Sequence, residues 1–194
     1  PFPAPMLDGA RAVQFLRHHA ETYHLDKRRF AAIGASAGGC ILMWLGFHPD
    51  LADPGNPDPV LRESSRLQVL APQAAQTCLH PATLVQWFGV ESLIEHPAFR
   101  PLFGLPETGE LKWTDELEAR VREASPITHL GADAPPIYLT YAAPVPVTET
   151  TEPAVYIHHA VMGFKLKEAM DAAGLECIVE AGGQKTRSEE RRVG

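Results

Sequence analysis

Short apolar runs and longer amphipathic segments alternate along the chain, and this alternation predicts an α/β fold. The runs that we expect to form strands are 30–33, 67–71, 135–141 and 175–180. The segments that we expect to form helices are 8–23, 37–47 and 156–173. Helices placed between successive strands are typical of a parallel sheet. We therefore predict a partial doubly wound, mostly parallel sheet.

The first predicted helix has one apolar face, formed by Val13, Leu16, Ala20 and Tyr23. We expect this face to pack against the rest of the domain.

Residues 79–125 differ from the rest of the chain and interrupt the alternation. Aromatic residues are scattered there among prolines and glycines, and an amphipathic stretch follows at 114–123. We interpret the segment as an insertion between two strands of a domain that spans 1–183. Its aromatic residues either cover a functional site or pack a small core of the insertion itself.

A tight turn of small residues lies between the first predicted strand and the helix that follows it. The turn reads Gly34-Ala35-Ser36-Ala37-Gly38-Gly39. A serine at such a turn is expected to be strained at positive φ, and side chains two residues away would collide, which explains Gly34 and Gly38. Gly39 would allow close packing of the helix. The alternative is an ordinary serine N-cap without chemistry.

The G-x-S-x-G pattern in this context resembles the nucleophile elbow of the α/β-hydrolase superfamily. The segment 4–12 before it is similar to the corresponding helix in hormone-sensitive-lipase-like and feruloyl-esterase-like hydrolases. The resemblance covers about residues 1–183. It implies a serine esterase that cleaves carboxylic esters through an acyl-enzyme on Ser36. The N–H of Ala37 would then stabilise the oxyanion.

In this superfamily the catalytic acid and then the histidine follow the serine along the chain. Alignment on Val145-Pro146 places Ala142 where the aspartate is expected. Glu149 and Glu152, later in the same loop, are the candidate acids. Asp133 precedes the strand and is expected about 20 Å away, at the opposite end of the sheet.

The histidine is expected in the loop beyond Ala181, but no histidine follows His159. His158 and His159 lie near the reactive edge and are candidate bases, or else polar residues of a first helical turn. A second oxyanion donor would lie before Pro1. We therefore expect a fragment that is weakly active or inert by itself, followed by a charged, non-native tail at 184–194, whose last eight residues look like a translated sequencing adapter.

Two other functions remain open. The hydrolase fold also serves non-enzymatic binding proteins that have lost catalytic residues, and Ala142 fits this possibility. Acyl transfer would use the same residues as hydrolysis. A histidine beyond residue 183 and an upstream His-Gly-Gly segment in the parent gene would favour the enzyme.

The composition of the chain excludes some classes of binding partner. The net charge is −7 over 194 residues, so nucleic acid is a poor partner, and no apolar run is long enough to span a membrane. Cys40, Cys78 and Cys177 lack metal-ligand spacing and are expected to be buried free thiols. The aspartates of the 48–59 loop lack calcium-loop spacing. We expect a small-molecule ester substrate and no cofactor or metal, and the sequence indicates neither the oligomeric state nor the compartment.

Overall fold

The computed structural model describes residues 1–186, and a five-stranded sheet forms its centre. The strands are β1 (Ala31–Ala35), β2 (Val69–Gln73), β3 (Ile137–Tyr141), β4 (Cys177–Ala181) and β5 (Gln184–Thr186), in that spatial order. The first four are parallel, and β5 pairs antiparallel with β4. The predicted α/β class and mostly parallel sheet are confirmed. The sheet extends three residues past residue 183, where we expected the tail to begin, and residues 187–194 lie outside the described part.

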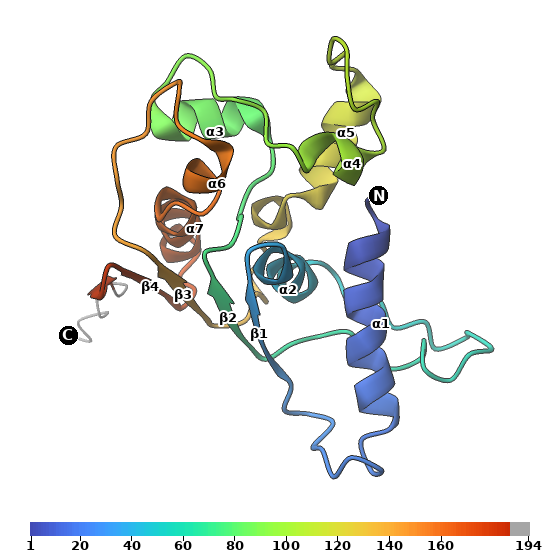
Figure 1. Ribbon diagram of the computed structural model, residues 1–194. Helices are drawn as coiled ribbons and strands as arrows, with labels where there is room; N and C mark the ends of the chain where they lie inside the picture. The colour runs from blue at the N-terminus through green and yellow to red at the C-terminus, as the bar shows by residue number, and fades with distance from the viewer. Residues whose placement is uncertain (187–194) are drawn as a thin grey trace.

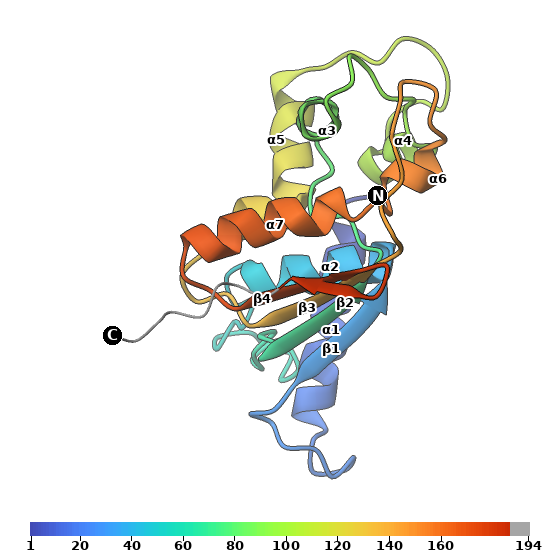
Figure 2. The same cartoon turned by 90° about the vertical axis from the view of Figure 1, so that its left-hand side faces the viewer.

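Seven α-helices and one 3-10 helix are described in residues 1–186. They are α1 (Ala4–His18), α2 (Ala37–Phe47), α3 (Pro81–Phe88), α4 (Phe99–Phe103), α5 (Asp115–Ala124), η1 (Pro126–His129), α6 (Pro153–Tyr156) and α7 (Val161–Ala172). Figure 1 shows α1 beside α2, and Figure 2 shows α2 and α7 along one side of the sheet with α3–α6 beyond them. No helix in this part of the chain is long and apolar enough to cross a membrane.

The predicted face of the first helix is confirmed only in part. Ala20 is buried and Val13 packs against the core. Leu16 and Tyr23 are exposed, however, whereas Gln14 and Arg17 are buried. Their polar ends are satisfied by loop carbonyls: Gln14 donates to Glu63 O at 2.9 Å, and Arg17 donates to Arg66 O at 2.8 Å. The helix can therefore bury these two long polar side chains, because backbone carbonyls of the neighbouring loop accept their hydrogen bonds.

The two faces of the sheet are covered very differently. Leu70, Leu139 and Val179 are fully buried, and Leu70 lies against Gly46 of α2 and Val179 against Gly163 of α7. On the other face, Ile33 is 72% exposed and Val69 is 46% exposed. Within residues 1–186 this second face is only partly covered near β1.

The predicted helix 156–173 is divided in two. α6 ends at Tyr156, four residues of turn follow, and α7 begins at Val161. His159 Nδ1 accepts the N–H of Val161 at 3.2 Å, which stabilises the first turn of α7. This division matters because it holds His158 in the turn.

The insertion 79–125 forms α3, α4 and α5. Phe99 and Phe103 are buried in the main hydrophobic core, so the insertion does not fold as a separate unit. α5 agrees with the predicted amphipathic stretch 114–123. Thr114 begins it by accepting the N–H of Leu117 at 3.2 Å.

Candidate active site

Ser36 occupies the sharp turn between β1 and α2, as the sequence predicts. Its backbone has φ 49° and ψ −121°, a strained conformation for a residue with a side chain. The turn is held by the sheet, because the N–H of Ser36 donates to Gln73 O at 2.9 Å. Its hydroxyl projects at the carboxyl edge of the parallel strands, where ligands of such sheets bind.

The glycines around Ser36 differ in whether close packing requires them. A Cβ on Gly34 would lie 2.8 Å from the backbone of Gly38, and one on Gly39 would lie 2.5 Å from Ala75. Close approach therefore explains both of these glycines. Our explanation is wrong for Gly38, because a Cβ there would meet no atom within 4 Å.

The imidazole of His158 faces the serine. Ser36 Oγ and His158 Nε2 are 2.8 Å apart, and His158 Nδ1 lies 2.7 Å from Ala154 O. Since a carbonyl only accepts, Nδ1 carries the proton and Nε2 presents its lone pair to the hydroxyl. This is the tautomer that a general base for Ser36 requires.

Ala37 is the first residue of α2. The N–H groups in the first turn of a helix have no partner within the helix, and the helix dipole adds positive charge there. The N–H of Ala37 therefore lies where negative charge developing next to Ser36 would be stabilised.

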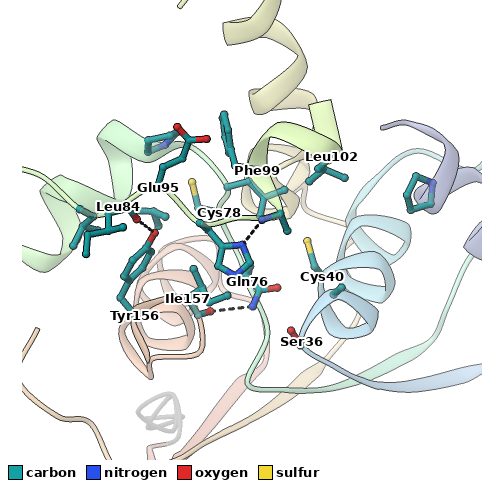
Figure 3. A pocket seen from close by; sticks show the side chains of 18 of the residues that line it. Ser36, Cys40, Gln76, Cys78, Leu84, Glu95, Phe99, Leu102, Tyr156 and Ile157 are labelled. Carbon is teal, nitrogen blue, oxygen red and sulfur yellow. Dashed lines mark hydrogen bonds between the residues drawn. The ribbon is translucent and has the colours of Figure 1, made fainter. Parts of the chain in front are cut away.

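A cavity of about 460 Å³ opens beside the serine (Figure 3). Ser36, Ala37 and Gln76 line its sheet side, and Phe99 and Tyr156 belong to its helical wall. Segments far apart in the sequence thus meet around one hydroxyl. A cleft of this size, with few polar groups near a nucleophile, is typical of an active site.

Residues 1–151 match the BD-FAE family model. This match covers most of the chain and includes Ser36. The chain belongs to the BD-FAE family. No curated protein sequence matches it.

Several solved structures have a fold similar to that of this BD-FAE chain. An acetyl ester-xyloside bifunctional hydrolase from Caldicellulosiruptor lactoaceticus matches at 21% identity and TM-score 0.64, over 93% of this chain and 55% of its own. A truncated carbohydrate esterase from gut microbiota matches at 18% identity and TM-score 0.62, over 93% of this chain and 60% of its own. The esterase Est2 of Thermogutta terrifontis matches at 22% identity and TM-score 0.59, over 91% of this chain and 51% of its own. The chain therefore spans just over half the length of these esterases and shares their fold.

The structure separates the two neighbouring histidines of this BD-FAE chain. His159 is 8% exposed, and its Nε2 lies 2.9 Å from Val145 O. Its Nδ1 accepts the N–H of Val161, and its Nε2 also lies 3.2 Å from the backbone N of Val145, so both ring nitrogens are engaged by the main chain. His159 thus fixes the loop after β3 and does not face Ser36.

Glu149 and Glu152 are exposed on that loop. Neither carboxylate is hydrogen-bonded to His158, whose Nδ1 pairs instead with Ala154 O. Asp133 lies before β3 and is paired with Arg66, at the far end of the sheet as predicted. The structure therefore brings Ser36, Ala37 and His158 together and leaves both candidate acids outside the group.

The three cysteines are buried free thiols, as predicted. Cys40 lines the cavity on the first turns of α2, and burial raises the pKa of its thiol to about 12. It therefore remains protonated beside the serine and does not compete with it as a nucleophile.

One group among the described residues has the chemistry of a metal site: His48, Glu123 and His129. It surrounds the C-terminal end of α2, the opposite end from Ser36. His48 Nε2 is 3.4 Å from Glu123 Oε1, but His129 Nε2 already lies 2.7 Å from the carbonyl of Glu123. The sequence analysis missed this group, because Glu123 and His129 follow His48 by 75 and 81 residues. Only the packing of α2, α5 and η1 brings the three side chains together.

Proposed function

We propose that the chain hydrolyses carboxylic esters through an acyl-enzyme on Ser36. The observation that carries this proposal is the 2.8 Å contact between Ser36 Oγ and a bare His158 Nε2. The esterase titles of the structural neighbours and the membership of the BD-FAE family support it.

The geometry corresponds to the following steps. Nε2 of His158 takes the hydroxyl proton while Oγ attacks the ester carbonyl, and the N–H of Ala37 binds the resulting oxyanion. The same imidazole then returns the proton to the departing alcohol, which leaves an acyl group on Ser36. His158 next deprotonates a water molecule that attacks this acyl group, so that a carboxylic acid is released and the hydroxyl restored.

Ala154 takes the orienting role that a carboxylate holds in a Ser-His-Asp triad. A neutral carbonyl fixes the imidazole tautomer, but it stabilises the imidazolium less than a carboxylate does. We therefore keep the expectation that this chain is a slow catalyst. The roles of Glu149 and Glu152 as acids stay predictions.

The test uses covalent labelling, so that it does not depend on fast turnover. A fluorophosphonate should attach to Ser36 as the Oγ–P bond forms and fluoride leaves, and mass spectrometry should place one label on this residue. Ser36→Ala should abolish both this label and the hydrolysis of an aryl acetate.

Each alternative has its own outcome in this test. An unlabelled Ser36 in the folded chain would favour a binding protein of the same fold. Transfer of the acyl group to an added alcohol, faster than to water, would favour an acyltransferase.

A further inference from the structure

The cavity beside Ser36 is almost entirely apolar. Its deep wall is formed by Leu84, Phe99 and Leu102 from helices α3 and α4 of the insertion (Figure 3). Ile41 and Cys40 on α2 form the wall nearest the serine. A group entering this space would leave water and contact hydrocarbon on most sides.

The few titratable groups in the wall carry no free charge. Glu95 is paired with Arg100, at 2.8 and 3.3 Å for its two carboxylate oxygens. Burial, together with the nearby His158, lowers the pKa of His96, whose Nδ1 accepts the N–H of Ala98 at 3.0 Å. Near neutral pH the wall therefore offers a neutral imidazole, protonated thiols and an ion-paired carboxylate. A charged ligand would find no unpaired charge of opposite sign.

The cavity lies on the acyl side of the serine. Ala37, which would hold the oxyanion, is among the lining residues, whereas His158 does not itself line the cavity but lies near its rim residue His96. The departing alcohol has to lie next to the imidazole that protonates it. The acyl chain is the part of an ester that is left to enter the cavity.

We propose that this cavity is an acyl-binding pocket for uncharged apolar acyl groups much larger than acetyl. The inference rests on the proposed esterase function and specifies its substrate class. A volume of about 460 Å³ corresponds to roughly fifteen water-sized groups at ~30 Å³ each. An acetyl group would leave most of this space without contacts.

The test is a series of p-nitrophenyl esters from acetyl to octanoyl. Each buried methylene contributes ~0.8 kcal/mol, which is about fourfold in kcat/KM. We expect kcat/KM to rise roughly a hundredfold or more from acetyl to hexanoyl. An ester of the same length that ends in a carboxylate should lose at least ~10-fold against hexanoyl, because its charge would be buried unpaired.

A variant pair locates the effect. Ala98→Phe adds a large side chain at a lining position, so it should lower the ratio of hexanoyl to acetyl hydrolysis about tenfold or more. Ala82→Phe is the matched control, since Ala82 is exposed, as Ala98 is, but does not line the cavity. It should leave the whole series unchanged.

The outcomes separate this inference from the proposed function. Ser36-dependent hydrolysis without any chain-length preference would overturn the pocket and keep the esterase. A preference that follows the alcohol part instead, in a series of alkyl acetates, would overturn the acyl assignment.

Binding supplies a readout that does not need turnover. Ser36→Ala should bind ethyl hexanoate at least ~10-fold more tightly than ethyl acetate by calorimetry, and Ala98→Phe should remove this difference. Equal affinities would overturn the pocket even if no ester is hydrolysed.

Discussion

The two ends of helix α2 both lie against imidazole groups, but the groups around them can do different things. At the N-terminal end, His158 Nε2 faces a hydroxyl at 2.8 Å and its ring is fixed by a backbone carbonyl. At the C-terminal end, His48 lies 3.4 Å from the Glu123 carboxylate and stacks on Trp44 at 4.1 Å between ring centroids. In the first arrangement the serine hydroxyl and the imidazole remain available to react with a substrate. In the second arrangement the side chains bind one another.

This comparison teaches that residue type alone does not define the site. The N-terminal end also has strained backbone, a helix dipole of the right sign for an oxyanion and an adjacent cavity. The C-terminal end has a histidine–carboxylate contact and stacked rings. We therefore expect substitutions at the first end to change chemistry and those at the second to change stability slightly.

The largest expected effect is that of His158→Ala. Loss of the base should lower kcat/KM for an aryl ester about 10²–10⁴-fold, the usual contribution of general acid-base catalysis. The fold should be retained, as circular dichroism would show, because within residues 1–186 the side chain is hydrogen-bonded only to Ser36 and Ala154.

His159→Gln is the matched control for this variant. It should weaken the anchoring of the loop at Val145 and cost less than about tenfold in kcat/KM, since His159 does not face Ser36. Equal losses at both histidines would contradict the assignment of His158 as the base.

Alanine substitutions at the two glycines of the serine turn, Gly34 and Gly38, should have different effects on stability. Gly34→Ala places a Cβ 2.8 Å from backbone, so we expect a loss of about 1–3 kcal/mol in the free energy of unfolding. Gly38→Ala meets open space within a helix and should be neutral or stabilising by up to about 1 kcal/mol. Denaturant unfolding of the two variants checks the contrast, and a destabilised Gly38→Ala would contradict it.

The candidate acids should matter little in this chain. Glu149→Gln and Glu152→Gln each remove a charge from the exposed loop, without a hydrogen bond to His158. We expect kcat/KM to change by less than about threefold, because the tautomer is set by Ala154. A loss near that of His158→Ala at either position would identify the acid, and would show that the loop rearranges when substrate binds.

The smallest effect is expected at the other end of α2. Glu123→Gln removes a half-exposed partner of His48, and such pairs contribute about 0–1 kcal/mol to stability. The melting temperature should fall slightly while kcat/KM stays the same. A clear loss of activity would break the division between the two ends of the helix.

The sequence predicted the parts of the molecule that depend on local pattern. Strand, tight turn and helix around Ser36 follow from small residues between two apolar runs, and the structure has them in that order. The four parallel strands follow in the same way, with ends shifted by about two residues.

The remainder depends on long-range contacts. Arg17 and Gln14 are buried because carbonyls of the 51–66 loop surround them, and nothing within α1 signals this. The meeting of His158 with Ser36 depends on the turn between α6 and α7, which a continuous helical pattern concealed. The family order also directed attention to a histidine beyond Ala181, so proximity across 122 residues could be stated only as one possibility.

The hydrogen bond from Ser36 N–H to Gln73 O has a consequence for protein engineering. The nucleophile is held by the main chain of two adjoining strands, while the far wall of its cavity comes from helices α3 and α4. Libraries that randomise Leu84, Ala98 or Leu102 would thus alter what is accepted without displacing the attacking atom. Selectivity and reactivity can be diversified separately in this scaffold, and this makes it a good starting point for directed evolution.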